Sequence, residues 1–187
     1  MEGPYNRRLQ AWRLHISEAV NGLIEREAGL LDNEVFLDAF VNATRAAQAT
    51  HQQEKLDALR NAMVNSVAPG APGPDEQARF FRLVDQFSAA HLTLLTFLDA
   101  SGPGWDLHSL HTTDLVVGKV IGRVIPMFRD RKDWYELLAS DLGNARLISQ
   151  PAFLADVPME LLPLTTPLGE RFLGFVRETI PPASSNP

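Results

Sequence analysis

Ala68-Pro-Gly-Ala-Pro-Gly-Pro74 is the stretch that divides this sequence. Three prolines and two glycines in seven residues interrupt any helix, because proline lacks a backbone N–H donor and clashes with the preceding turn. The sequence therefore predicts a linker at 69–74 between a helical N-terminal unit, residues 1–68, and a second unit, residues 75–179. The tail at 180–187 is predicted to be disordered.

Three helices are predicted before the linker. In the first, from about Tyr5 to Ala28, apolar residues recur every third or fourth position, which is typical of a helix with one buried face. Asp32 or Asn33 is expected to cap the second helix. These apolar stripes exceed what one small bundle buries, so we expect a homodimer formed through the N-terminal helices.

Four further helices are predicted after the linker, beginning near positions 75, 113, 130 and 167. Gly118 and Gly122 give the helix near 113 a small-residue face that permits close packing. Residues 145–166 are apolar but are interrupted by three prolines, and they are expected to form two short strands with a loop between them. The fold class is therefore mainly α with a small β-hairpin.

Composition and charge exclude several classes of protein. The chain has no cysteine, which excludes a disulfide framework, a thiolate metal site and a cysteine nucleophile, and suits a reducing compartment. No apolar run has the length of a signal peptide or a membrane span, so a cytoplasmic protein without membrane association is expected. The formal net charge of −6 disfavours simple nucleic-acid binding, whose affinity comes from phosphate neutralisation.

One short segment runs against the acidic balance of the chain. Residues 115–132 contain five basic side chains against a single carboxylate, Asp130. Lys119 and Arg123 lie one helical turn apart and therefore share a face. The segment is a candidate site of phosphate contact, although a solvated helix face explains it as well; its basic residues are Lys119, Arg123, Arg129, Arg131 and Lys132.

Residues 86–178 resemble a winged-helix domain. The segment 91–98 is similar to its first helix, 113–125 to its second, and 130–142 to the third helix, which reads DNA in DNA-binding members. The most specific part is Thr166-Pro167-Leu168-Gly169, similar to the start of the final helix, where threonine caps and proline fits the first turn. The resemblance implies an N-terminal helical bundle followed by a winged-helix-like unit whose hairpin near 150–160 is the wing.

The third helix departs from the DNA-binding members of that family. It carries Asp133, Glu136 and Asp141, and carboxylates have little use against phosphate. The expected wing has no Lys or Arg between Gln150 and Glu160. The N-terminal half is similar to uncharacterised bacterial helical proteins at 43–45, 51–55 and 59–62, a similarity that implies no activity.

The only weak metal candidates are His108 and His111, which lie near Asp106 and Asp114. Their segment is expected to be a loop, where turn hydrogen bonding explains them better than zinc or iron. His91 lies on an apolar helical face and is expected to be a hydrogen-bonded core histidine. No phosphate-binding loop, nucleophile elbow or dinucleotide fingerprint is present, so no cofactor is expected.

These observations favour a non-enzymatic interaction protein that binds a protein partner, which includes a second copy of itself. The alternative is a winged-helix DNA-binding regulator that contacts phosphates through the basic residues of 119–132.

Overall fold

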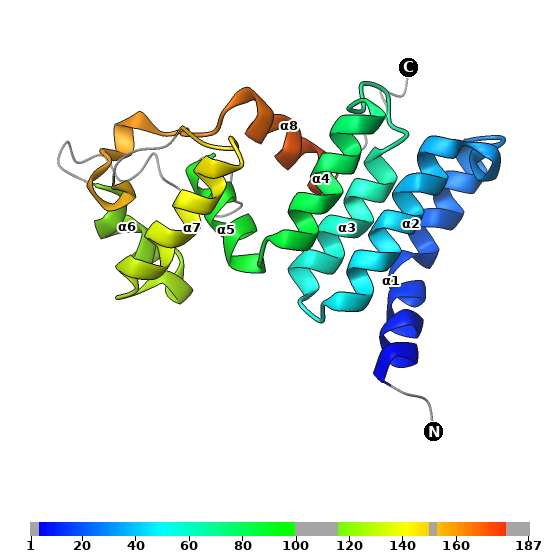
Figure 1. The fold of residues 1–187 in the computed structure, drawn as a ribbon, viewed down its shortest axis with the longest axis horizontal. Coiled ribbons are helices and arrows are strands. Elements are labelled where there is room, and N and C mark those ends of the chain that lie inside the picture. Colours follow the sequence, from blue (N-terminus) through cyan, green and yellow to red (C-terminus); the bar gives the residue numbers. More distant parts are fainter. Residues whose placement is uncertain (1–3, 100–115, 150–152, 179–187) are drawn as a thin grey trace, which may run out of the picture. The chain divides into compact units, whose positions relative to one another are not determined.

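The computed structural model describes residues 4–99, 116–149 and 153–178. Over these ranges the chain forms eight α-helices joined by loops and 3-10 turns, with no β-strand (Figure 1). The prediction of a mainly α fold is confirmed. None of the helices in these ranges is long and apolar enough to cross a membrane. The predicted disordered tail at 180–187 lies outside the described residues.

The chain divides into two compact units. The first unit comprises residues 1–89 together with 172–187, and the second comprises residues 90–171. The predicted linker at 69–74 connects two helices that both belong to the first unit. The boundaries between the two units therefore lie after residue 89 and after residue 171, and not at the proline- and glycine-rich segment.

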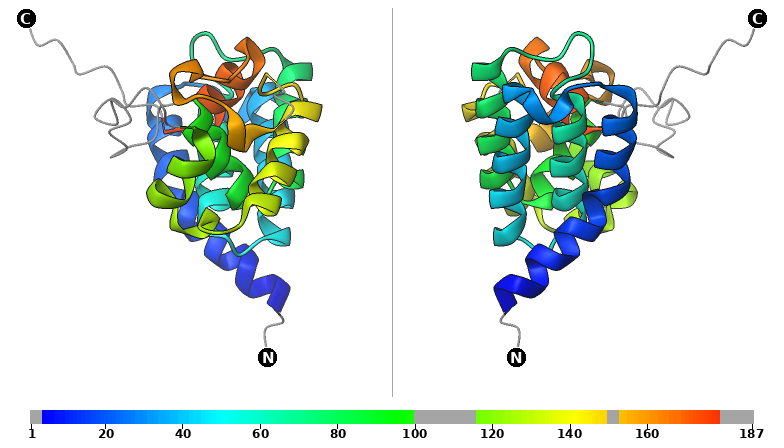
Figure 2. Two further views of the ribbon diagram at one scale, coloured as in Figure 1. Left: turned by 90° about the vertical axis from the view of Figure 1, so that its left-hand side faces the viewer. Right: turned by 90° about the vertical axis from the view of Figure 1, so that its right-hand side faces the viewer.

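Four helices form the body of the first unit, and they pack as a bundle in which α2 contacts each of the others. The last turns of α8 complete this unit. In Figure 2 the N-terminal end of α1 extends beyond the ends of its neighbours in the bundle. The four bundle helices are α1 (Pro4–Arg26), α2 (Glu34–Ala49), α3 (Gln53–Asn65) and α4 (Pro74–Gln86). The helix α8 spans Pro167–Val176.

The ends of these helices follow from local sequence signals. The side chain of Asn33 accepts hydrogen bonds from the backbone N–H groups of Val35 and Phe36, at 3.0 and 3.2 Å, and so confirms the predicted cap of α2. Gly29 lies between α1 and α2 with a φ of 84°, a left-handed conformation that glycine adopts at little cost. Pro74 begins α4, as its fixed φ favours.

An aromatic cluster explains why α4 belongs to the first unit. The rings of Phe80 and Phe172 lie edge to face with centroids 5.4 Å apart, and Phe81 and Phe175 meet in the same way at 5.5 Å. Edge-to-face contacts of this kind add to the free energy gained from apolar burial. The cluster ties the C-terminal end of α8 to α4, a contact between residues about 90 positions apart.

The apolar stripe of α1 is buried within a single chain. Trp12, Ile16 and Leu23 are almost inaccessible to solvent, and α1 packs against α2 and α3. The indole N–H of Trp12 donates to the hydroxyl of Thr44 on α2, at 3.0 Å. Because the fold itself covers this stripe, the stripe gives no reason to expect a second copy of the chain.

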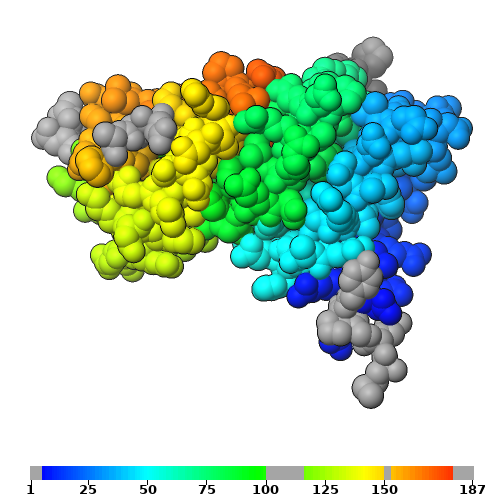
Figure 3. All heavy atoms as spheres, viewed as in Figure 1, coloured from blue at the N-terminus to red at the C-terminus, as the bar shows by residue number. Residues whose placement is uncertain are grey.

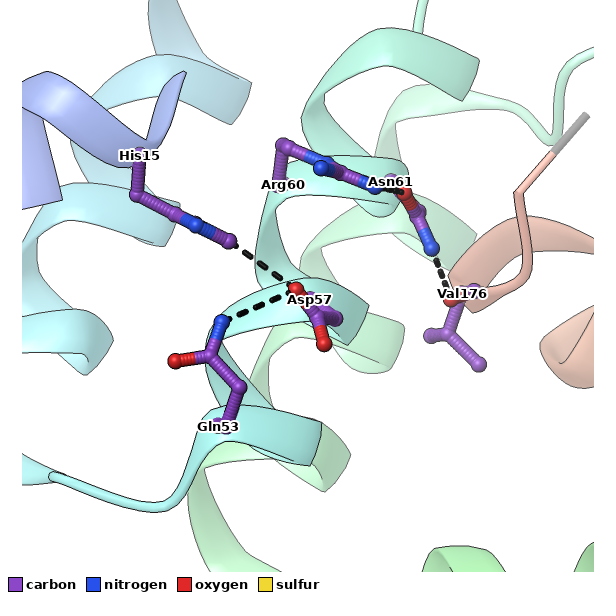
Figure 4. Close-up of polar contacts among 6 residues, drawn as sticks. All are labelled: His15, Gln53, Asp57, Arg60, Asn61 and Val176. Carbon is purple, nitrogen blue, oxygen red and sulfur yellow. Dashed lines mark hydrogen bonds and ion pairs between the residues drawn. The ribbon is translucent and has the colours of Figure 1, made fainter.

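Two asparagines of α3 hold the end of α8. The side-chain amide of Asn65 donates to the carbonyl oxygens of Phe175 and Arg177, both at 2.9 Å. The amide of Asn61 donates to the carbonyl of Val176 at 3.1 Å (Figure 4). The last carbonyls of a helix have no partner within the helix, so these side chains provide the donors they lack. Asn61 and Asn65 therefore have a structural role.

We expect Asn65→Ala to lower the free energy of unfolding by about 2 kcal/mol, because it leaves buried carbonyl groups without a donor. Asn61→Ala is the matched control: Asn61 is half-buried and reaches a single carbonyl, so its loss is expected to cost less, about 1 kcal/mol. Urea unfolding of both variants measures the difference. Equal costs would contradict this role of Asn65.

The described part of the second unit contains three helices, three 3-10 turns and the start of α8. Its buried side chains are large and apolar, and include Leu94, Ile121 and Phe128. The helices are α5 (Ala89–Leu98, whose first residue belongs to the first unit), α6 (Val117–Val124) and α7 (Lys132–Asn144), and the turns are η3 (Pro126–Phe128), η4 (Leu154–Asp156) and η5 (Met159–Leu161).

The predicted β-hairpin is not found in the described part of residues 145–166. That part forms η4 and η5, and its pairing is limited to two isolated bridges, Ile148 with Thr165 and Val116 with Pro158. Proline cannot donate to a strand ladder, and Pro158 and Pro163 both interrupt this segment. The backbone N–H groups of η4 are also engaged elsewhere, by a carboxylate described below.

The Thr-Pro-Leu-Gly motif fits the start of α8 as predicted. The hydroxyl oxygen of Thr166 accepts a hydrogen bond from the N–H of Gly169 at 3.1 Å, and Pro167 is the first residue of the helix. The same hydroxyl donates to the carbonyl of Arg146 at 2.7 Å. The motif therefore both caps α8 and fixes it to the segment that follows α7.

Candidate functional site

The helix α6 presents two basic side chains on one face. Val117, Val120 and Ile121 are buried, whereas Lys119 and Arg123 are exposed. The two basic residues are four positions apart and thus neighbours on the helix surface, as the sequence predicted. The helix is anchored by its apolar face and holds both cations toward solvent.

The two glycines of α6 allow other segments to approach it closely, which confirms the predicted small-residue face. A Cβ atom on Gly118 would lie 2.8 Å from the carbonyl oxygen of Ala155, and one on Gly122 would lie 3.0 Å from Cα of Arg129. Real Cβ atoms essentially never show the first distance, and the second would require the neighbouring backbone to shift. Gly118 thereby lets η4 approach α6, and Gly122 lets the backbone at Arg129 run directly against the helix that carries Lys119 and Arg123.

The segment between α6 and α7 is anchored by aromatic rings. Phe128 and Tyr135 are buried and meet edge to face with centroids 6.3 Å apart. Between them Asp130 adopts a φ of 57°, a left-handed conformation that turns the chain sharply before α7. The exposed residues of this turn therefore lie in a short segment that Phe128 and Tyr135 anchor at its two ends.

These elements enclose a pocket with a volume of about 660 Å³ in the second unit. All five basic residues predicted from the sequence line it, and Asp130 is the single carboxylate among the lining residues that the structure describes. In Figure 3 the segments 116–131 and 132–144, green to yellow, form adjoining surfaces. We call this site the basic pocket; its charged lining residues are Lys119, Arg123, Arg129, Asp130, Arg131 and Lys132.

The cations of the basic pocket are not neutralised by the described part of the chain. No described carboxylate lies within 4.0 Å of any of the five. The guanidinium of Arg131 lies 5.4 Å from the ring centre of Trp134, within the range of a cation–π contact. Like charges held together without counter-charges create a positive potential that attracts anions.

Two of the three acids of α7 are engaged by other residues of the second unit. This weakens the sequence argument that the acids of this helix disfavour contact with phosphate. The carboxylate of Glu136 accepts the N–H groups of Leu154 and Ala155, at 2.9 and 2.7 Å, and so holds η4. Asp141 pairs with His91, whose Nε2 lies 3.3 Å away. His91 is buried and hydrogen-bonded, as predicted. Neither acid is among the described residues that line the basic pocket, and Asp133 is exposed and has no such partner.

Tyr135 is a member of the site that the sequence did not reveal. Its side chain lines the basic pocket, is only 4% exposed, and forms no hydrogen bond with any described residue. Burial raises the pKa of its phenol above the usual value, and the negative charges of Glu136 and Asp156 add to the rise. The hydroxyl therefore stays protonated and able to donate.

The raised pKa of Tyr135 predicts a loss of stability at alkaline pH. An unfolded tyrosine ionises near pH 10, while the folded phenol resists ionisation, so the unfolded state loses its proton first. Stability present below about pH 10 is therefore lost as the pH rises toward the folded pKa. Phenylalanine does not ionise, so we expect the free energy of unfolding of Tyr135→Phe to fall less over that pH range than that of the parent protein.

The chain offers a clean way to measure this pKa, because its only other tyrosine is Tyr5. In a Tyr5→Phe background, tyrosinate absorbance reports Tyr135 alone and should appear at a higher pH than in a free tyrosine peptide. Ionisation at the pH of the free peptide would show that the phenol is not held as described.

The weak metal candidates His108 and His111 lie outside the described residues. Within the described ranges, no group of three or more histidine, aspartate or glutamate side chains is placed to hold a metal ion.

A smaller pocket of about 320 Å³ lies in the first unit, between α1, α3 and the chain after α8. Its acids, Glu18 and Glu178, balance its arginines, Arg26 and Arg60. The two asparagines in its wall are engaged with α8, as shown above.

Next to that pocket, His15 approaches Asp57 from α1 (Figure 4). Its Nε2 atom lies 3.1 Å from a carboxylate oxygen of Asp57 but lacks the geometry of a hydrogen bond. Gln53 donates to the same oxygen at 3.1 Å. This region has mixed charge, and no single kind of ligand is indicated by it.

Comparison of the chain with family models, with characterised proteins and with solved structures gives no significant match.

Proposed function

We propose that this protein is a non-enzymatic binding protein that holds an anionic segment of a partner protein in the basic pocket. One observation carries the proposal: five cations line a single concave site, and no described carboxylate pairs with them. Keeping like charges together costs free energy in the unbound protein, and an anionic partner recovers it.

The lining of the basic pocket supports binding more than catalysis. Its described ionisable groups are five cations, the carboxylate of Asp130 and the phenol of Tyr135, whose raised pKa keeps it protonated and so unavailable as a base near neutral pH. General acid–base or nucleophilic chemistry needs an activated base or nucleophile beside a second oriented group. The described lining residues do not include such a pair.

DNA binding is the second candidate, and the engagement of Glu136 by η4 and of Asp141 by His91 favours it. With those acids occupied, the start of α7 and the face of α6 present mainly basic groups, and the order α5, α6, α7 follows that of the helices in a winged-helix domain. Against it, 153–161 forms 3-10 turns where a wing is expected. A pocket also suits a narrow segment better than a duplex.

Fluorescence anisotropy distinguishes the two candidates. A labelled oligoglutamate peptide and a labelled mixed-sequence duplex are titrated with the protein at low salt and then at rising salt. The proposal predicts that the peptide binds and that its affinity falls with salt, because the contact is electrostatic. Tighter binding of the duplex would favour DNA. Absence of binding to either probe at low salt would overturn the proposal.

A further inference from the structure

We infer that the basic pocket selects clustered phosphate groups over carboxylates, and that the hydroxyl of Tyr135 donates a hydrogen bond to one of the phosphate oxygens. The inference rests on the proposed function, since both require the pocket to hold an anion. It adds the chemical class of that anion and a residue that recognises it.

The density of charge is the first argument. Among the described lining residues, five basic residues minus Asp130 leave four net positive charges around a volume of about 660 Å³. A carboxylate brings one negative charge, whereas a phosphate ester brings about 1.5 to 2 at neutral pH. Two or three phosphates therefore balance the charge of the described lining residues, whereas four separate carboxylates would be needed for the same balance.

The placement of the cations is the second argument. Lys119 and Arg123 approach from α6, while Arg129, Arg131 and Lys132 approach from the turn before α7 and from its first residue. A phosphate group has several oxygens in a tetrahedral arrangement and accepts hydrogen bonds from different sides at once. Arginine is suited to such oxygens, because its planar guanidinium donates two parallel hydrogen bonds.

Tyr135 is the third argument. It is a buried polar side chain that lines the pocket and has no hydrogen-bond partner in the described part of the chain. The phenol ring is buried while its hydroxyl oxygen stays accessible to solvent, so an acceptor on a ligand in the pocket would give the hydroxyl the partner that the described chain does not supply. The hydroxyl is neutral, so it adds direction to a site whose other contacts are charges.

Isothermal titration calorimetry with two small probes of similar charge tests the selectivity. The probes are tripolyphosphate and butanetetracarboxylate, added to the full chain at one salt concentration. We expect tripolyphosphate to bind at least tenfold more tightly. Equal affinities would overturn the phosphate selectivity and leave the proposed function standing. If neither probe binds and the oligoglutamate peptide does not bind either, both fail.

Two variants test the recognition itself. Tyr135→Phe removes one hydroxyl and is expected to weaken tripolyphosphate about tenfold, the effect of one hydrogen bond to a charged group, with little change for the tetracarboxylate. Arg131→Lys keeps the charge but loses the planar fork, and should weaken tripolyphosphate in the same selective way. Arg131→Lys therefore tests the recognition even if Tyr135→Phe does not fold. Equal losses for both probes would overturn the assignment.

A peptide pair separates two sources of the same chemistry. One peptide carries two adjacent phosphoserines, and its twin carries glutamates at those positions. Binding of the phosphopeptide well above its twin supports a phosphorylated protein segment as the ligand. Binding of tripolyphosphate without the phosphopeptide supports a free oligophosphate instead. Preference for the glutamate twin would contradict the inference.

Discussion

Gly169→Ala is expected to lower the free energy of unfolding of the second unit by about 3 kcal/mol or more. Gly169 lies in the first turn of α8, where a Cβ atom would overlap the carbonyl oxygen of Leu147 and lie 3.0 Å from its carbonyl carbon. The backbone cannot easily move aside, because that carbonyl accepts the N–H of Thr166 at 3.0 Å. The motif thus needs glycine for close approach, in addition to its capping threonine.

Gly174→Ala is the matched control in the same helix. A Cβ atom there meets nothing within 4 Å, and Gly174 is exposed. Because alanine favours a helix over glycine, this variant is expected to be neutral or more stable by up to about 1 kcal/mol. Thermal and urea unfolding of the pair measure the contrast. A loss of similar size in both variants would contradict the account of Gly169.

The double variant Arg123→Ala and Arg131→Ala is expected to weaken binding of an anionic probe by about 100-fold or more at low salt. Each arginine lines the basic pocket, and a hydrogen bond to a charged group contributes about 1.5–3 kcal/mol. Both side chains are exposed, so the fold should survive. Anisotropy or calorimetry at fixed salt gives the ratio of affinities.

The control for this variant removes the same charge elsewhere. Arg13→Ala with Arg45→Ala takes two exposed arginines from the first unit. If recognition belongs to the basic pocket, the control should bind the probe within about twofold of the parent protein, because neither arginine lines that pocket and salt screens charges that do not touch the probe. A similar loss in both double variants would show that only the total charge of the chain matters.

Features set by neighbouring residues could be predicted from the sequence. The cap at Asn33, the start of α4 at Pro74 and the Thr166 cap of α8 depend on atoms within a few positions of one another. The basic pocket belongs to this class in part. Its five cations lie within fourteen positions, 119–132, so one helix face and the turn after it bring them together.

Features that depend on distant residues could not be predicted. Glu136 and Asp141 look like acids that would repel phosphate, because the sequence does not show that η4 and His91 engage them. The role of α4 depends on rings near position 175, about 90 residues later. The absence of a hairpin in the described part of 145–166 could have been predicted, because the three prolines in that segment disfavour two paired strands.

The most direct test of the basic pocket is to map where an anion binds. Tripolyphosphate is titrated into isotopically labelled protein of 20.7 kDa, and the amide and arginine side-chain resonances are followed by NMR. The account predicts saturable shifts that cluster at residues 116–135, with the largest among the basic residues and Tyr135. Shifts confined to the first unit, or scattered over the surface without saturation, would contradict it.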